Sequence, residues 1–310
     1  MRIYNELSSV ELDRESLLAI GVFDGVHAGH RHLIEDLTDR ASSTGKLAGV
    51  VTFRTHPAEF LDSYSNIQYL TSLDQRIKLL EDIGVDFVVP VTFDHDFSEL
   101  RAKDFISLLQ SHLNMAGIVI GEDFAMGHNR EGDVKTLVNM GKHMGFSVDV
   151  VRLLGNSDSL ITTSTVIRKM IGMGKVEEAS KLLGRNFVLE GNVVRGAGRG
   201  SVLGFPTANI ETEKKMLLPG DGIYATWVYL NNRRHIASTS IGTRPTFDEI
   251  ERTIEAYLLD FSEDIYGQLI RLEFVNRLRD EEKYDTVDKL LVQMAKDVEI
   301  TRSIMSIGHN

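Results

Sequence analysis

The chain has 310 residues, of which 42% are hydrophobic and 25% charged, with a formal net charge of -11 and no cysteine. This length predicts two domains of about 150 residues each. The lack of cysteine excludes disulfides and thiolate metal sites. The acidic balance argues against nucleic acid as the main ligand. No apolar run approaches the ~20 residues of a membrane helix, and the acidic N-terminus does not resemble a signal peptide. We therefore expect a cytoplasmic protein that binds neither nucleic acid nor membranes.

Residues 1–183 alternate apolar runs with helical patterns. The apolar runs predict strands at 17–23, 47–53, 85–91, 116–121 and 146–153. Between these runs, apolar residues recur three and four positions apart, as they do along helices. This alternation predicts an α/β Rossmann-like domain with a parallel sheet covered on both faces. Ligands of such sheets bind at the carboxyl ends of the strands.

Residues 184–310 have a different pattern. Five short strand-like runs are separated by Gly, Asn, Asp and Pro, and a helical pattern appears only at 285–304. Such spacing predicts an antiparallel barrel or sandwich with a C-terminal helix packed on it. We place the domain boundary at 183/184, within the segment LGRN.

The segment GVFDGVHAGHRHL, residues 21–33, lies where the first predicted strand ends and a helix begins near Gly29. Free backbone N–H groups and the helix dipole favour an anion at such a point. Gly25 and Gly29 allow a phosphate chain to approach the backbone closely. The imidazoles of His27 and His30 can donate hydrogen bonds to phosphoryl oxygens.

Two alternatives remain for this loop. His27 and His30 can hold zinc with His56 as a third ligand, although the glycine-rich loop lacks the usual helical zinc pattern. They can also be incidental surface histidines. His32 falls inside the predicted helix and is expected to be an ordinary helix residue.

His56 follows the second strand and Asp123 the fourth, at the same edge of the predicted sheet as His27. His56 fits either ligand binding or a helix cap, and Asp123 fits either ligand binding or a turn cap. Further along, Thr163, Ser164 and Thr165 precede a helical run that contains Arg168. These hydroxyl groups fit either an N-cap or a phosphate site, and Arg168 is either an exposed helix residue or a charged phosphate ligand.

A second constellation lies in EGNVVRGAGRGSVLGFPTANI, residues 190–210. The alternating glycines Gly196, Gly198 and Gly200 suit a loop that folds over phosphates, or a plain hairpin loop. Thr207 and Asn209 stand two apart on one extended segment and present neutral oxygens. Together with nucleotide phosphates, such oxygens can complete the shell of a magnesium ion.

Several ordered motifs resemble one known family. FDGVHAGH (23–30), TFRTHP (52–57), GEDFAMGHNREG (121–132) and ITTSTVIR (161–168) are followed by GFPTAN (204–209), EAYLLDF (255–261) and LRDEEKYDTVDKLL (278–291). The chain resembles, over essentially its whole length, the bacterial bifunctional riboflavin kinase/FMN adenylyltransferases. The resemblance implies a nucleotidyltransferase domain at 1–183 and a six-stranded riboflavin kinase barrel at 184–310.

The resemblance also implies the chemistry. Riboflavin and ATP would give FMN in the barrel, and FMN and ATP would give FAD and pyrophosphate in the first domain, each with Mg²⁺. It implies four catalytic residues, namely Glu255 as general base with His27, His30 and Arg168. It implies ATP binding by Gly21, Phe23, Gly25, Gly29, Ser164, Thr165, Gly196, Gly198, Arg199 and Gly200. It implies flavin binding by His56, Asp123 and Arg279, and Mg²⁺ binding by Thr207 and Asn209.

The chain departs from the family pattern at Met126, Val166 and Arg244, which bear on packing around the nucleobase or flavin. Two other readings therefore stay open: one active domain beside a binding module, or a flavin-binding regulator without turnover. Retention of both Glu255 and the His27/His30 pair favours catalysis, because binding alone requires no base. A homo-oligomer is also left open.

Overall fold

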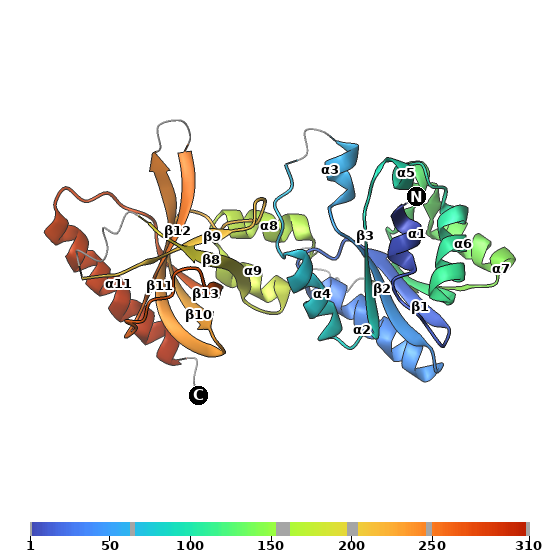
Figure 1. Ribbon diagram of the computed structural model, residues 1–310, viewed down its shortest axis with the longest axis horizontal. Helices are drawn as coiled ribbons and strands as arrows, with labels where there is room; N and C mark the ends of the chain where they lie inside the picture. Colours follow the sequence, from blue (N-terminus) through green and yellow to red (C-terminus); the bar gives the residue numbers. More distant parts are fainter. Residues whose placement is uncertain (1, 63–65, 153–161, 197–203, 246–249, 308–310) are drawn as a thin grey trace. The chain divides into compact units, whose positions relative to one another are not determined.

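The computed structural model describes residues 2–62, 66–152, 162–196, 204–245 and 250–307. The chain divides into two compact units (Figure 1). The first, here called unit 1, comprises Met1–Ile67 and Ser72–Thr163. The second, unit 2, comprises Gln68–Thr71 and Ser164–Asn310.

Unit 1 is built on a five-stranded parallel sheet in the order β3-β2-β1-β4-β7. Its strands are β1 (Ser16–Gly21), β2 (Leu47–Phe53), β3 (Phe87–Val91), β4 (Met115–Gly121) and β7 (Ser147–Val151). The predicted α/β fold and its five strands are confirmed. Burial on both faces holds for β1, β2 and most of β4, whereas β3 and β7 are partly exposed because each is an edge strand with one neighbour.

Helices cover both faces of this sheet. They are α1 (Arg2–Leu7), α2 (Ala28–Ser43), α3 (Pro57–Leu61), α4 (Leu73–Glu81), α5 (His95–Ser98), α6 (Ala102–Leu113) and α7 (Val134–Met144), with a small hairpin of β5 (Ala125–Met126) and β6 (Gly132–Asp133). Alternation along β1 separates the two faces, because side chains of a strand point to opposite sides. Leu17 and Ala19 join the core under α2, and Leu18 and Ile20 join the core under α6.

Unit 2 is a closed six-stranded antiparallel barrel in the order β10-β11-β12-β9-β8-β13. Its strands are β8 (Phe187–Val194), β9 (Ala208–Thr212), β10 (Gly222–Leu230), β11 (Arg233–Pro245), β12 (Ile250–Leu258) and β13 (Leu269–Arg279). The predicted barrel and its C-terminal helix, α11 (Val287–Ile307), are confirmed. The sixth strand, β9, begins within the GFPTANI segment and continues to Thr212.

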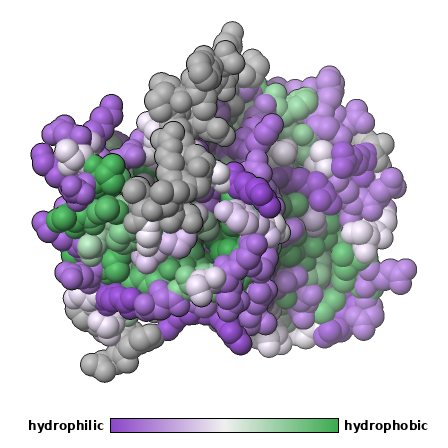
Figure 2. Space-filling model, turned by 60° about the vertical axis from the view of Figure 1, so that its left-hand side comes forward, coloured by the Kyte–Doolittle hydropathy of each residue, from purple (hydrophilic) through white to green (hydrophobic). Residues whose placement is uncertain are grey.

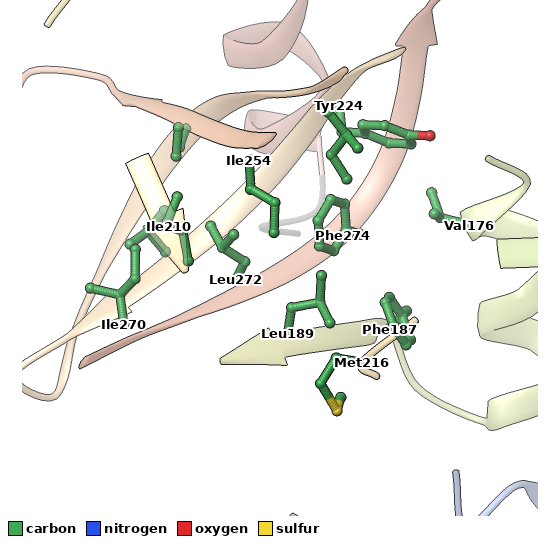
Figure 3. Packing of buried hydrophobic residues seen from close by; sticks show 14 of the residues in the cluster. Val176, Phe187, Leu189, Ile210, Met216, Tyr224, Ile254, Ile270, Leu272 and Phe274 are labelled. Atoms are coloured by element: carbon green, nitrogen blue, oxygen red, sulfur yellow. The ribbon is translucent and has the colours of Figure 1, made fainter. Parts of the chain in front are cut away.

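The barrel core extends to two helices, α8 (Ser164–Gly172) and α9 (Val176–Leu183). Leu189, Ile254, Leu272 and Phe274 point toward one another inside the barrel (Figure 3), and Ile167, Ile171 and other side chains of the two helices join the same cluster. The packing therefore divides the chain at 163/164, whereas the change of sequence pattern lies at 183/184. The reason is that the apolar faces of α8 and α9 are buried with the barrel.

Hydrophilic side chains cover most of the face in Figure 2, with hydrophobic side chains visible between them. In the described part of the chain, the helices are too short or too polar to cross a bilayer.

Candidate active sites

The histidine loop joins β1 to α2 and has an unusual backbone. Phe23 has φ 52°, Gly25 φ 80° and Val26 φ 38°. Such values are costly for residues other than glycine and tend to be kept at functional sites. A Cβ on Gly21 would lie 3.0 Å from the Phe23 ring, so glycine lets this ring fold back over the end of β1.

His27 and His30 meet at the start of α2. His27 is only 5% exposed and is the N-cap residue, and its Nδ1 accepts a hydrogen bond from the backbone N–H of His30 at 3.3 Å. The two rings stack with centroids 3.7 Å apart, and the Phe23 ring meets His30 edge-on at 5.2 Å. The predicted helix start near Gly29 is correct to one residue, since α2 begins at Ala28.

The surroundings of His30 keep its ring uncharged. Burial, followed by the nearby His27 and Arg76, holds the pKa of His30 well below 6.5. Its Nδ1 is buried and has no hydrogen-bond partner among the described residues. A neutral imidazole still carries one N–H donor, so His30 can donate to a phosphoryl oxygen at neutral pH.

His56 and Asp123 both follow strands of the sheet, β2 and β4. The Nδ1 of His56 accepts from the N–H of Ala58 at 3.1 Å, so His56 caps α3 as one sequence interpretation proposed. Asp123 lies in an exposed turn, and its carbonyl accepts from Arg130 at 3.3 Å. The departure at Met126 falls in the hydrophobic core, where this side chain is buried.

Ser164, Thr165 and Arg168 lie in α8, which belongs to unit 2. The Nε of Arg168 donates to the carbonyl of Gln68 at 2.8 Å, within the same unit. Since the histidine loop belongs to unit 1, a shared role of these residues with His27 stays a prediction.

The described residues contain no group of three or more His, Cys, Asp or Glu side chains placed to hold a metal. His27, His30 and His56 therefore do not form the three-ligand set that the zinc alternative requires.

The barrel site brings four predicted residues together. Glu255 on β12 pairs directly with Asn209 on β9, and the Thr207 hydroxyl donates to Glu255 Oε2 at 3.1 Å. A Cβ on Gly196 would lie 2.2 Å from the Asn209 side-chain nitrogen, so only glycine allows this approach. Two neutral oxygen groups and a carboxylate thus lie together where the start of β9 pairs with β12.

A pocket of about 410 Å³ opens beside Glu255. This is within the usual size of small-molecule sites. Its wall includes Thr207, Arg279 and the rings of Phe205 and Tyr257, which meet at 5.2 Å. A smaller pocket of about 240 Å³ shares Thr207. Sequence reasoning did not single out Phe205 or the pocket role of Tyr257, although both lie in or beside the quoted motifs.

Arg279 is held firmly in the pocket wall. Its Nε lies 3.0 Å and its Nη2 2.7 Å from the carboxylate oxygens of Asp297 on α11, a residue that is 3% exposed. This hydrogen-bonded ion pair raises the pKa of Arg279. Asp297 was missed because nothing in a helical pattern distinguishes one inward-facing acid.

Glu281 is a further acid in the pocket wall. Burial, together with the carboxylates of Asp221 and Glu255, raises its pKa. A Cβ on Gly242 would come within 2.4 Å of the Glu281 carboxylate, so glycine makes room for this side chain. The predicted phosphate ligands Gly198, Arg199 and Gly200, and the side chain of Arg244, lie outside the described residues.

Comparison with known proteins matches each unit to an enzyme domain. Residues 9–165 match the FAD synthetase family model and residues 183–305 the riboflavin kinase model. The two matches together define a two-domain enzyme of flavin cofactor synthesis.

Relatives of the whole chain agree with these domain matches. The bifunctional riboflavin kinase/FMN adenylyltransferase of Listeria monocytogenes is 34% identical over 297 residues, covering 95% of this chain and 94% of the relative. That of Escherichia coli K12 is 35% identical, covering 91% and 90%. A solved structure described as a macrolide-efflux protein from Streptococcus pneumoniae has a TM-score of 0.88 at 30% identity, over 96% of both chains. The chain belongs to the family of bifunctional riboflavin kinase/FMN adenylyltransferases.

Proposed function

We propose that this chain makes FAD in two steps, phosphorylating riboflavin in unit 2 and adenylylating FMN in unit 1. The observation that carries the proposal is a group of candidate reacting residues in each unit. Glu255 with Thr207 and Asn209 supports the first step, and the stacked His27 and His30 at a helix N-terminus support the second.

In the kinase step, Glu255 accepts the proton of the riboflavin 5′-hydroxyl as that oxygen attacks the γ-phosphorus of ATP. ADP leaves and FMN forms. The 410 Å³ pocket suits the flavin, because Phe205 and Tyr257 offer rings to its isoalloxazine system and Glu255 reaches the hydroxyl from the pocket wall. Arg279 lies in the same wall, and its flavin-binding role is part of this proposal.

The smaller pocket, joined to the first at Thr207, suits the nucleotide. The Thr207 hydroxyl and the Asn209 amide oxygen would hold Mg²⁺ together with ATP phosphates, since this ion prefers oxygen ligands shared with its substrate. When bound, Mg²⁺ neutralises phosphate charge. Gly196, which has no side chain, leaves room for the Asn209 amide.

In the adenylyl step, a phosphate oxygen of FMN attacks the α-phosphorus of ATP, and pyrophosphate leaves. The reacting phosphate needs little activation, so catalysis consists of positioning and stabilising charge. N–H groups at the start of α2 and the rings of His27 and His30 serve this purpose. Gly21, Phe23, Gly25 and Gly29 shape the loop, and Ser164, Thr165 and Arg168 remain proposed ATP ligands. His56 and Asp123 remain proposed flavin ligands. ATP-dependent chemistry favours the cytoplasm.

One assay tests both steps. Pure protein is incubated with MgCl₂, ATP and either riboflavin or FMN, and the flavins are separated by chromatography. Glu255→Gln should abolish FMN formation and spare FAD formation from FMN. His30→Ala should do the reverse and slow FAD formation about 10²–10³-fold, a loss of ~2.7–4 kcal/mol. Glu211→Gln, at an exposed residue, and His32→Ala, at a partly exposed residue, are controls and should behave as wild type. Failure of the unmodified protein to form FAD from FMN would refute the proposed adenylyl transfer.

A further inference from the structure

Arg76 is a buried cation of unit 1 that has no role in the steps above. It lies on α4, exposes 1% of its surface, and shares the core-facing side of that helix with Leu80. Taking an arginine out of water costs several kcal/mol unless its donors are well used. We therefore ask which groups the guanidinium of Arg76 contacts.

The guanidinium ends at the carboxyl edge of the sheet. Its Nη1 donates to the carbonyl of Val22 at 3.0 Å and to the carbonyl of Phe53 at 2.7 Å. The Thr52 hydroxyl also donates to the Val22 carbonyl, at 2.9 Å. Val22 is the first residue after β1 and Phe53 the last of β2, so one nitrogen joins the ends of two adjacent strands.

Each of these two carbonyls begins a loop that carries a histidine. Val22 opens the segment that leads to His27 and His30, and Phe53 opens the segment that leads to His56. The start of α4 is stabilised by a reciprocal capping box, which Ser72 and Gln75 form. Arg76 therefore extends from the capped start of α4 to the two carbonyls at which the loops begin.

We infer that Arg76 is a positioning residue for adenylyl transfer. Its guanidinium links the two histidine-bearing loops to one another at the sheet edge. The inference rests on the proposed function of unit 1 and adds a residue that acts through His27 and His30 rather than on the substrate. Small displacements of such groups reduce rates strongly, because reacting atoms must stay aligned. The positive charge has a second effect, since it is one of the three causes that lower the pKa of His30, after burial and His27.

Two variants and a control test this role in the full-length protein. Arg76→Met removes the charge and the hydrogen bonds to the carbonyls of Val22 and Phe53, and Arg76→Lys keeps the charge on a shorter chain. Lys78→Met on the exposed side of α4 is the matched control. Arg76→Met should lower kcat for FAD formation from FMN at least tenfold, Arg76→Lys should lie between it and wild type, and Lys78→Met should stay within twofold. Riboflavin phosphorylation by unit 2 should be unchanged in all three.

The titration of His30, followed by NMR, separates positioning from simple stabilisation. Its midpoint should rise in Arg76→Met and stay low in Arg76→Lys. The inference is overturned if Arg76→Met forms FAD within twofold of wild type, or if activity falls while the midpoint of His30 does not move. If Arg76→Met does not fold, Arg76→Gln replaces it with the same thresholds. A wild-type chain that makes no FAD would refute the proposed function, whereas the His30 titration would still test the placement of Arg76.

Discussion

His27 caps α2 with the same imidazole that we propose for the adenylyl step. As the N-cap it accepts the N–H of His30, and its ring stacks on the ring that it helps to place. The capping interaction therefore also sets the geometry of the two imidazoles. Sequence reasoning recognised the pair from its place between strand and helix, but the stacking and the uncharged state of His30 depend on burial by neighbours.

The stability of unit 1 should depend on pH through His30. Because the folded pKa of His30 lies below 6.5, the unfolded state binds a proton first as the pH falls. The free energy of unfolding is therefore unaffected by His30 above pH 6.5. Below pH 6.5 it decreases, by up to about 1.4 kcal/mol per pH unit for one proton. Calorimetric unfolding between pH 7.5 and 5 should show this loss in wild type and less of it in His30→Gln.

His32→Gln is the control for this experiment, because His32 lies on the partly exposed face of the same helix. It should keep the wild-type dependence. An identical pH dependence in His30→Gln and wild type would contradict the prediction.

Gly196 should be essential to the kinase step. An added methyl group would meet the Asn209 amide at 2.2 Å and push it away from Glu255 and Thr207. Overpacking of this kind costs about 1–3 kcal/mol. We expect Gly196→Ala to lower kcat/KM for riboflavin phosphorylation at least tenfold and to leave FAD formation from FMN unchanged. Gly172→Ala is the matched control, since a Cβ there meets nothing within 4 Å. Equal activities of the two variants would refute this argument.

At the scale of elements, one acidic side chain of α9 forms hydrogen bonds to the barrel. Glu177 Oε1 accepts from the side chain of Asn276 at 2.9 Å and from the backbone N–H of Arg277 at 3.0 Å. These two hydrogen bonds join α9 to β13, and one of them satisfies the backbone N–H of Arg277.

Removing this acceptor should destabilise unit 2. Glu177→Ala leaves the N–H of Arg277 without the carboxylate, at a cost of about 1–3 kcal/mol. Urea unfolding followed by the fluorescence of Trp227, the single tryptophan, should show a lower midpoint. The neighbouring Glu178 is exposed, so Glu178→Ala should change the midpoint little. Similar midpoints for both variants would exclude the fastening role.

At the scale of the whole molecule, the boundary between the two packed units lies at 163/164, whereas the sequence pattern changes at 183/184. The buried residues Ile167, Ile171, Val176 and Leu183 precede the barrel in sequence but belong to its core. Helices α8 and α9 are therefore part of what stabilises unit 2.

Two fragments distinguish the boundaries. Residues 164–310 retain α8 and α9, whereas residues 184–310 lose several side chains that each contribute about 1.5–3 kcal/mol by burial. We expect a cooperative urea transition for 164–310 and a much lower midpoint, or no transition, for 184–310. Trp227 reports both. Equal midpoints would show that the barrel folds without the two helices.

Much of the fold could be predicted because it follows from local pattern. Apolar runs and helical spacing predicted the five parallel strands, and turn signals predicted a second domain rich in short strands. The strand β9, Ala208–Thr212, was missed as a strand because its segment was interpreted only for its oxygen ligands. The motif residues were singled out as site candidates, whereas Arg76, Asp297 and Glu281 were not, because charged residues in a helix or polar loop usually face water.

The sequence by itself determined the class of each domain and the candidate residues for its chemistry, because periodicity, glycine placement and motif spacing are local properties. Tertiary structure alone decided which of these residues meet. It paired Glu255 with Asn209 across two strands, stacked His27 on His30, and brought Arg76 from α4 beneath two loops. These contacts join residues distant along the chain or depend on burial, and both arise only when the strands and helices have packed.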